Sequence, residues 1–465
     1  MIKPLQPWYW RSLPLEGKTG SEVFAALFLK PNAIATLLES PTQKDEDKTN
    51  SSFKNSRYSI CAGVPRIINE QPQLWTPPIG EILPFLHRLL SHPLPLPDSP
   101  GDLPFTGGWL GWLGYDLAWE IERLPQYKSD PLPFPVAYWY EPECFAVLDN
   151  WEQTLWLAVT KRHQLDLLQN KLEQVTDKNT ENSPSRPLTK PHFYTNQIEY
   201  EDIVRQAKKY IKAGDIFQAN LSLRFEAQTT ADSWEIYRKL QQINPSPFAS
   251  YWQTPWGSAI SCSPERLVKL AQNQAETRPI AGTRSRSSDP DTDRQQEEDL
   301  LANRKENAEH IMLVDLERND LGKVCEWGSV VVDELLAIER YSHVMHLVSN
   351  ITGTLRSDRN AIDLIRALFP GGTITGCPKV RCMEIIEELE PVRRNLFYGS
   401  CGYLDWRGHL DLNIFIRTLL FTSSSPNNTV WGQVGAGIVA DSDPEKEWYE
   451  SLAKAQAQLT ALYLA

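Results

Sequence analysis

Apolar residues recur at helical spacing between Asn196 and Gly214 of this chain. Asn196 and Glu199 match the capping-box pattern at the start of the stretch, and Gly214 marks its end. The apolar positions between them follow the i, i+3, i+4, i+7 spacing of one helix face and are Tyr200, Ile203, Val204, Ala207, Tyr210 and Ile211. The stretch is predicted to be an amphipathic helix that opens the second part of the chain.

Strict alternation of apolar and polar residues follows this helix. Residues 216–225, IFQANLSLRF, predict a strand whose polar face either meets solvent or lines a cavity. Residues 409–421, HLDLNIFIRTLLF, alternate too and predict one strand with Arg417 on the same side as Asp411 and Asn413. A third strand is predicted in TVWGQVGAGIVADS at 429–442.

The order of these elements predicts the fold class. Strands come before and after helical stretches without a regular βαβ rhythm, which favours an α+β fold with antiparallel sheets. A length of 465 residues favours two domains or one large composite domain. Residues 173–191 contain almost no apolar side chains and predict a linker or surface loop between an amino-terminal region, 1–172, and a carboxy-terminal region, 192–465.

Composition narrows the classes of function. The chain has 47 Lys and Arg against 59 Asp and Glu, a net charge of −12, which argues against a nucleic-acid binder and leaves anionic ligands to a local basic pocket or a metal ion. Without an apolar run of about 18 residues, no contact with a membrane is expected. Seven cysteines without a C-x-x-C pair fit neither a disulfide framework nor a zinc site and favour a reducing, cytoplasmic compartment.

Two pairs of glutamates share the same spacing on predicted helices. Glu306 and Glu309 form one pair, and Glu447 and Glu450 form the other. A spacing of three places both carboxylates of a pair on one helix face. Two such faces brought together suit a hard cation such as Mg²⁺, whereas either pair alone is typical of exposed helix charge.

Three further features are candidates for chemistry. The glycines of FPGGTITGCP at 369–378 run into a predicted helix whose first turn holds Pro378, which makes either an anion site at its N-terminus or a simple turn. Glu265 follows an apolar strand, where burial would raise its pKa toward use as a general acid. His346 is a candidate for proton transfer, although a lone histidine is more often structural.

Taken in order, the motifs of residues 195–460 resemble the chorismate-utilising enzymes: anthranilate synthase component I, aminodeoxychorismate synthase component I, isochorismate synthase and salicylate synthase. LLES at 37–40 and LPFTGGWLGWLGYD at 103–116 resemble the amino-terminal part of the two amino-transferring members. The motifs that carry the resemblance include GDIFQANLSLRF, SCSPERLV, RPIAGTRSR, AEHIMLVDLERNDLGKV, YSHVMHLVSNITG, FPGGTITGCPKVRCMEIIEELEP, YGSCGYLDWRGHLDLNIFIRT and GAGIVADSDPEKEWYES.

This resemblance implies two large antiparallel sheets packed face to face, with helices around them and chorismate and Mg²⁺ bound between. Glu309 and Glu450 match metal-ligand positions, with Glu306 and Glu447 beside them. The residues that match chorismate-binding positions are Arg417, Tyr403, Lys454, Gly435, Gly437 and, in the turn at 279–283, Gly282. Catalytic roles are implied for Glu265, His346, Thr373 and Gln218.

The choice among members depends on the nucleophile. Gln218 stands where isochorismate and salicylate synthases carry the lysine that activates water, so hydration is disfavoured. Ala281 stands where aminodeoxychorismate synthases typically carry a nucleophilic lysine, and Thr373 is typical of anthranilate synthases. Anthranilate is therefore the expected product. The motifs FPGG, SCSPERLV and NPSPFASY resemble the aminodeoxychorismate branch instead, which keeps that synthase as the alternative.

The resemblance also implies partners. Nothing in the chain resembles a glutamine amidotransferase, so ammonia is expected from a separate subunit of that kind. Ser40, Pro247 and Phe248 resemble the walls of the tryptophan pocket of feedback-inhibited anthranilate synthases, where tryptophan is either regulatory or structural. A paralogue that binds chorismate or tryptophan without turnover is a third hypothesis. The intact glutamates, His346 and Arg417 argue against it.

Overall fold

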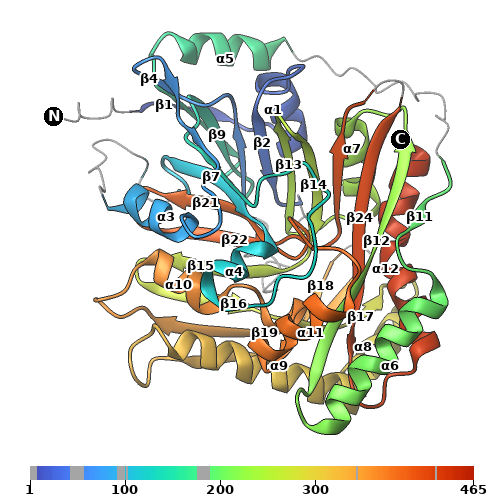
Figure 1. The fold of residues 1–465 in the computed structure, drawn as a ribbon. Helices are drawn as coiled ribbons and strands as arrows, with labels where there is room; N and C mark the ends of the chain where they lie inside the picture. The colour runs from blue at the N-terminus through green and yellow to red at the C-terminus, as the bar shows by residue number, and fades with distance from the viewer. Residues whose placement is uncertain are drawn as a thin grey trace.

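The computed structural model describes residues 8–41, 57–91, 100, 103–174, 189–341, 344–424 and 427–465. Residues 175–188 of the predicted linker lie outside the described residues. Figure 1 shows two large β-sheets with helices around them. All strand pairs in the described part are antiparallel, which confirms the predicted α+β class.

The larger sheet has twelve strands. In spatial order they are β1 (Tyr9–Pro14), β10 (Thr154–Val159), β9 (Cys144–Asp149), β3 (Tyr58–Ala62), β2 (Ala35–Glu39), β13 (Phe248–Thr254), β14 (Gly257–Ser263), β23 (Thr418–Thr422), β24 (Asn428–Ile438), β12 (Gln218–Thr229) and β11 (His192–Phe193), while β20 (Gly376–Cys377) pairs with β12.

The second sheet has ten strands. In spatial order they are β17 (Ile280–Ser285), β19 (Val344–Thr354), β16 (Gln274–Arg278), β15 (Arg266–Ala271), β22 (Leu410–Ile414), β21 (Ser400–Asp405), β7 (Gly108–Leu113), β8 (Ala137–Tyr140) and β6 (Leu74–Trp75), while β18 (Val331–Arg340) pairs with β19. A small hairpin joins β4 (Ile67–Ile68) to β5 (Gln71–Pro72).

Each sheet takes strands from both predicted regions of the chain. In the larger sheet β2 pairs with β13, with Leu37 opposite Tyr251. In the second sheet β7 pairs with β21, with Gly111 opposite Gly402. The division at 173–191 stays a prediction, but the regions on either side of it share both sheets.

Helices surround the two sheets. Those packed with the larger sheet are α1 (Gly20–Leu27), α5 (Gln164–Glu173), α6 (Gln197–Ala213), α7 (Ser233–Ile243) and α12 (Pro444–Leu464). The remaining helices are α3 (Ile82–Leu90), α4 (Ala118–Ile121), α8 (Pro290–Ala302), α9 (Arg304–Gly322), α10 (Ala361–Leu368) and α11 (Lys379–Leu389), with short 3₁₀ turns η1 (Tyr115–Leu117) and η2 (Gly372–Ile374).

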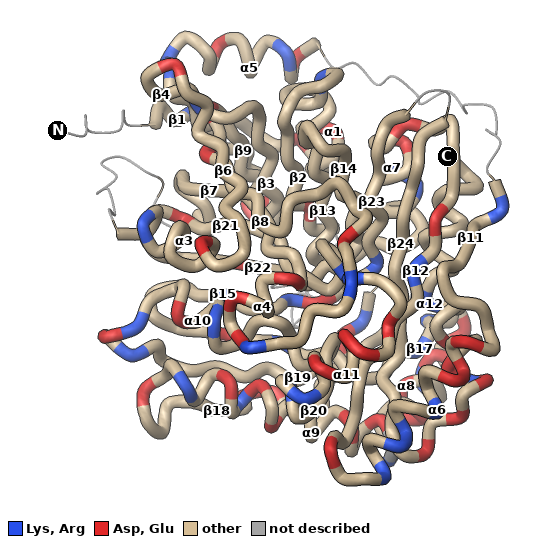
Figure 2. The backbone as a smooth tube through the Cα atoms, in the orientation of Figure 1, with Lys and Arg blue, Asp and Glu red and all other residues tan. Residues whose placement is uncertain are grey.

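Two apolar cores hold this arrangement together. One lies between the sheets and joins residues of both, such as Trp112 on β7 and Trp252 on β13. The other joins the opposite face of the larger sheet to its helices, as with Phe225 and Trp448. Figure 2 shows acidic and basic residues interspersed along outer helices such as α6. Burial of apolar surface on both faces of the larger sheet is the main stabilising contribution.

The predicted helix at 196–214 is confirmed. The side chain of Asn196 accepts from the N–H of Glu199, whose side chain accepts from the N–H of Asn196, and Gly214 ends α6 in the left-handed conformation with φ 83°. The predicted glutamate helices are also present, as α9 and α12. At the glycine-rich segment, Pro378 is the N-cap of α11 rather than a residue of its first turn.

The strand predicted at 216–225 is confirmed from Gln218 onward. Its polar residues Gln218, Ser222 and Arg224 are buried, so this face lines the interior and does not meet solvent. The alternating pattern at 216–225 includes Phe217 among its apolar positions, but Phe217 lies before the strand and is 68% exposed. The strand predicted at 429–442 is also confirmed, as β24.

The single strand predicted at 409–421 is wrong. Its first half is β22 in the ten-stranded sheet, and its second half is β23 in the twelve-stranded sheet. The chain crosses between the sheets at Phe415–Arg417, where Arg417 takes φ 52°. Arg417 therefore does not lie on one strand with Asp411 and Asn413. Alternation alone does not separate one long strand from two short ones joined by a left-handed residue.

In the parts of the chain that the structure describes, no helix is both long enough and apolar enough to cross a membrane.

Candidate active site

Glu265 is a buried acid between β14 and β15. Its residue is 5% exposed. Burial raises the pKa of its carboxyl to about 8, and the charge of Glu317 adds to this rise. The hydroxyl of Thr373 and the N–H of Ile280 oppose it. A carboxyl in this environment holds its proton at neutral pH, so Glu265 is suited to donate a proton.

Thr373 contacts Asn220, and Gln218 lies against Gly437, the residue that pairs with Asn220. Thr373 lies in η2, and its carbonyl accepts from the side-chain amide of Asn220 at 3.2 Å. Asn220 pairs with Gly437 across the two strands. A Cβ at residue 437 would lie 2.3 Å from Nε2 of Gln218, so only a glycine leaves room for this amide. Among the described residues, the buried Oε1 of Gln218 has no hydrogen-bond partner, which leaves one polar atom available to a ligand.

Arg417 and His346 lie close enough to interact electrostatically; His346 is buried and Arg417 is half-buried. Burial lowers the pKa of the Arg417 guanidinium, and the hydroxyl of Tyr398 partly offsets this. Burial, together with the charge of Arg417, lowers the pKa of His346 to about 4, so its imidazole is neutral at neutral pH. The hydroxyl of Thr283 lies 2.8 Å from its Nδ1. Arg417 has no ion pair within the described ranges, and a half-buried guanidinium of this kind is suited to bind a carboxylate.

Lys454 extends from α12 to the backbone of β24. Its Nζ donates to the carbonyl of Gly435 at 3.0 Å and pairs with Glu450 at 2.8 Å. A Cβ at residue 435 would lie 2.3 Å from the carbonyl oxygen of Leu221, so no side chain fits there. Lys454 is therefore in contact with the strand at Gly435, and its role in binding chorismate stays a prediction.

The two glutamate pairs stand on separate helices. Glu306 pairs with Arg284 at 3.2 Å, and a Cβ at Gly282 would lie 2.1 Å from its Oε2. Glu309 is half-buried one turn further along α9. On α12, Glu447 is buried and Glu450 is exposed. Within the described residues, no group of three or more His, Cys, Asp or Glu side chains is placed to hold a metal ion. The four-glutamate site therefore stays a prediction.

Ala281 lies next to Gly282 on β17. Its methyl group contacts a small apolar cluster of Leu300, Met345 and Leu347. Leu300 lies on α8 and the other two lie on β19. The methyl group of Ala281 thus packs against apolar side chains, and the turn predicted at 279–283 is part of a strand.

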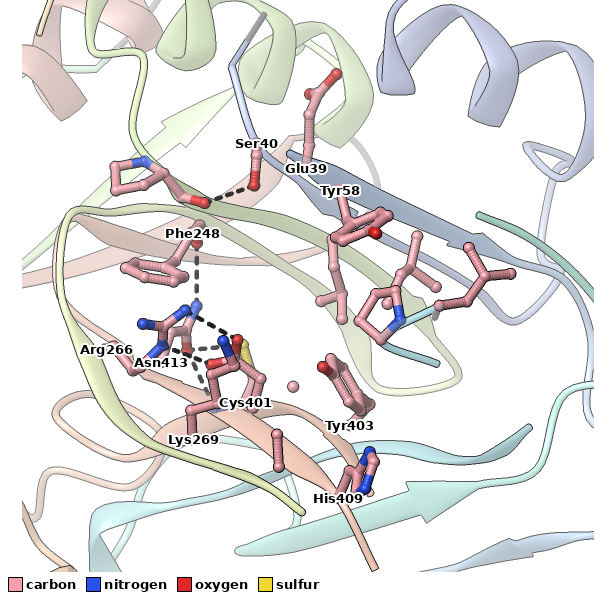
Figure 3. A pocket seen from close by; sticks show the side chains of 18 of the residues that line it. Glu39, Ser40, Tyr58, Phe248, Arg266, Lys269, Cys401, Tyr403, His409 and Asn413 are labelled. Carbon is pink, nitrogen blue, oxygen red and sulfur yellow. Dashed lines mark hydrogen bonds and ion pairs between the residues drawn. The ribbon is translucent and has the colours of Figure 1, made fainter. Parts of the chain in front are cut away.

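A separate cavity of about 350 Å³ lies beside β2, β13 and β21. Figure 3 shows Ser40 and Phe248 on one side of it and Tyr403 and His409 on the other. Ser40 Oγ donates to the carbonyl of Pro247 at 2.9 Å. The three residues predicted to form a tryptophan pocket thus line one cavity. Tyr403, which was predicted to bind chorismate, lines this cavity as well. It therefore lies with Ser40, Pro247 and Phe248 rather than with Arg417.

Charged residues form the floor of this cavity. Arg266 is buried, pairs with Asp411 at 2.9 Å and Glu276 at 2.6 Å, and its guanidinium lies 4.9 Å from the ring centroid of Phe248. In Figure 3 Glu39 points away from the cavity. Its carboxylate accepts from the N–H of Ser21 at 2.7 Å. A cavity with aromatic walls and a charged floor suits a small zwitterion with an apolar side chain.

The sequence profile described as chorismate binding enzyme matches residues 49–460. The chain belongs to this family. It is 62% identical to an anthranilate synthase component I-like protein of Synechocystis sp., over 99% of this chain and 93% of that protein. It is also similar to Bacillus subtilis aminodeoxychorismate synthase component 1, at 44% identity over 78% of each chain, and to Synechocystis sp. anthranilate synthase component 1, at 42% identity over 82% of this chain and 81% of that one.

A solved structure supports the same family. Anthranilate synthase component I from Streptococcus pneumoniae superposes with a TM-score of 0.73 at 29% identity, covering 90% of this chain and 95% of the other. The protein is therefore a chorismate-utilising enzyme with two large antiparallel sheets. This confirms the family and the fold that the motifs implied.

Three residues of this chorismate enzyme were missed by sequence reasoning. Thr283 contacts the imidazole of His346, Tyr398 lies beside Arg417 with φ 65°, and Glu317 is a buried carboxyl near Glu265. All three stand inside motifs that carried the resemblance, so their position in those motifs was a signal. Glu317 is one of several charged residues of α9, and its burial distinguishes it from a solvated helix residue.

Proposed function

We propose that the chain aminates chorismate at ring carbon 2 with ammonia and eliminates pyruvate to give anthranilate, as component I of an anthranilate synthase. The observation that carries this proposal is Ala281. Its methyl group cannot attack the ring, and its neighbours Leu300, Met345 and Leu347 supply no amine. Ammonia is then the group that bonds to carbon 2.

The buried side chains take distinct roles in this reaction. Arg417 and Lys454 bind the carboxylates of chorismate, the first without having to break an ion pair. Glu265 is protonated at neutral pH and gives its proton to the departing hydroxyl at carbon 4. Thr373 and the amide of Gln218 orient ammonia beside carbon 2.

His346 serves the second half of the reaction. Because its pKa is lowered to about 4, its imidazole is neutral and able to accept the proton from carbon 2 as pyruvate leaves. The hydroxyl of Thr283 at Nδ1 fixes the orientation of the ring. A charged imidazolium beside Arg417 would be repelled, so the two residues together keep this base ready.

The donor set of the two glutamate pairs fits Mg²⁺, because all four side chains offer carboxylate oxygens. Glu309 and Glu450 would hold the ion, with Glu306 and Glu447 beside them. When bound, Mg²⁺ neutralises the ring carboxylate of chorismate and fixes its orientation. Lys454 holds Glu450 at 2.8 Å and the carbonyl of Gly435 at 3.0 Å, which keeps this carboxylate beside β24.

Two partners belong to this proposal. Ammonia would come from a separate glutamine amidotransferase subunit, since no part of the sequence resembles one. Tryptophan would occupy the cavity that Ser40, Pro247 and Phe248 line, as either a regulatory or a structural ligand.

Aminodeoxychorismate synthesis is the second candidate, and a specific observation favours it. Synechocystis sp. holds two relatives of this chain, and the one named anthranilate synthase component 1 is only 42% identical. The relative at 62% identity is therefore a second protein of the same organism. The Bacillus subtilis aminodeoxychorismate synthase component 1 is 44% identical to this chain, which is about as similar to it as that anthranilate synthase is.

A product assay tests the proposal. The purified chain is incubated with chorismate, Mg²⁺ and an ammonium salt, and products are separated and identified by mass. Anthranilate with release of pyruvate supports the proposal. A product that retains the pyruvyl ether and yields 4-aminobenzoate only after addition of aminodeoxychorismate lyase shows the second candidate. No turnover indicates a chorismate- or tryptophan-binding paralogue.

A further inference from the structure

Glu317 on α9 is a buried glutamate that no step of the proposed reaction uses. Its residue is 4% exposed. Its carboxylate accepts from the hydroxyl of Thr277 at 3.2 Å and from the N–H of Gly372 at 3.3 Å. In the described part of the chain it has no ion pair, because the nearby Lys379 donates to Asp320 at 2.6 Å instead. A buried carboxyl without a cation is destabilising, which points to a role in function.

Glu317 and Glu265 approach the same short backbone segment from two elements. Glu317 accepts from the N–H of Gly372, and Glu265 lies against the hydroxyl of Thr373. A Cβ at residue 372 would lie 2.5 Å from Cδ2 of Leu316 and 3.2 Å from Oε1 of Glu317, so a glycine is needed for this approach. The two acids therefore flank one turn of the chain.

Thr277 connects the Glu317 carboxylate to the ten-stranded sheet. Its hydroxyl donates to the carbonyl of Leu267 at 2.9 Å as well as contacting Glu317. Leu267 lies two residues after Glu265 on β15. The position of Glu317 relative to Glu265 is thus fixed by β15, β16, η2 and α9 together.

Glu317 affects the ionisation of Glu265. Burial raises the pKa of Glu265, and Glu317 contributes to this rise. Burial also raises the pKa of Glu317, where Lys379 opposes the rise and Asp320 adds to it. When Glu317 is ionised, its negative charge disfavours ionisation of Glu265.

We infer that Glu317 is a positioning residue for Glu265: its carboxylate, held at Gly372 and Thr277, keeps the reactive proton on Glu265 across the neutral range. The inference rests on the proposed role of Glu265 as proton donor. It does not depend on which amine product forms, because the hydroxyl at carbon 4 leaves in both candidate reactions. The charged groups that face Glu317 are Glu265, Asp320 and Lys379.

The test is the pH dependence of kcat/KM in Glu317→Gln. This variant keeps the size of the side chain and an acceptor for the N–H of Gly372, but removes the charge. Chorismate consumption is measured from about pH 6 to about pH 9.5 at constant free ammonia and saturating Mg²⁺. We expect the alkaline limit of activity to move to lower pH by about one unit, an activity loss of about tenfold relative to wild type at the alkaline end.

Glu388→Gln is the matched control, because Glu388 is exposed on α11 and bonds to the hydroxyl of Tyr210. It is expected to keep the wild-type alkaline limit. Thr277→Val offers a second test if Glu317→Gln folds poorly. Loss of the Thr277 hydroxyl makes Glu317 harder to ionise, so the limit moves in the same direction by a smaller amount.

An unchanged alkaline limit with a uniform fall of kcat at every pH overturns the inference and makes Glu317 structural. Failure of the proposed function itself looks different. In that case Glu265→Gln retains turnover, and the wild-type profile has no alkaline limit near the pKa of Glu265. Glu317→Gln therefore tests the inference, and Glu265→Gln tests the proposed function.

Discussion

A Cβ atom at residue 282 would lie 2.1 Å from Oε2 of Glu306. The glycine on β17 thus lets a carboxylate of α9 lie directly against the strand, next to Ala281. The same Cβ would lie 2.5 Å from Cδ1 of Leu300, so an alanine displaces side chains of both α8 and α9. Gly282 therefore determines the position that the Glu306 carboxylate can occupy.

Gly282→Ala is expected to raise the Mg²⁺ concentration for half-maximal turnover by about tenfold, because it displaces a carboxylate of the proposed metal site. The measurement is a Mg²⁺ titration of the initial rate at saturating chorismate. Gly322→Ala, at the end of the same helix and with no atom within 4 Å of the added Cβ, is the control. An unchanged Mg²⁺ requirement in Gly282→Ala would remove Glu306 from the metal site.

Arg417→Gln separates substrate binding from stability. The half-buried Arg417 guanidinium has a lowered pKa and lacks an ion pair among the described residues, so its removal is expected to leave Tm unchanged or higher. Loss of a carboxylate partner is expected to weaken chorismate binding by about 2 kcal/mol or more, which raises KM at least about thirtyfold. Steady-state kinetics and thermal unfolding measure the two effects.

Arg417→Lys is the companion variant. It keeps the charge but loses the planar fork that binds a carboxylate through two parallel hydrogen bonds. Its KM is expected to lie between those of wild type and Arg417→Gln. A large drop in Tm with unchanged KM in Arg417→Gln would show that the guanidinium is structural.

Local patterns made part of this fold predictable. The caps of α6 at Asn196 and Gly214 act within a few residues, so the sequence alone specifies where the helix begins and ends. The alternation in β12 likewise requires only a strand. What the alternation left open was the environment of Gln218 and Arg224, because it depends on a second sheet contributed by distant segments.

The placement of several site residues could not be predicted, because it depends on long-range strand pairing. Arg417 was assigned to one strand with Asp411, but its left-handed φ lets the chain leave one sheet and enter the other. Tyr403 matches a substrate-binding motif, yet β21 places it in the cavity with Ser40. Glu317 looks like a surface charge until α9 is packed against the sheet. Each outcome depends on contacts between residues far apart in the chain.

Glu265→Gln is expected to change the pH dependence of stability. The folded state raises the pKa of this carboxyl from 4.5 to about 8, so between these values the folded protein binds a proton that the unfolded chain releases. The contribution of Glu265 to stability is present below the lower value and is lost as pH rises through the window, at about 1.4 kcal/mol per pH unit.

Glutamine does not titrate, so the free energy of unfolding of the variant is expected to gain on that of wild type as pH rises through this window. Urea denaturation at several pH values measures the difference. A difference that stays constant with pH would contradict the raised pKa. The result is independent of turnover and of the product formed.

Ser40→Phe tests the occupant of the cavity between β2 and β21. The larger side chain fills part of the 350 Å³ space and removes the hydrogen bond from Ser40 Oγ to the carbonyl of Pro247. If tryptophan occupies this cavity, its affinity is expected to fall at least about tenfold in the variant. Isothermal titration with tryptophan, and with glutamine and tyrosine as ligand controls, measures the change. Equal tryptophan affinity in wild type and variant would place the ligand elsewhere, because a phenylalanine at residue 40 and an indole ring cannot share the same walls.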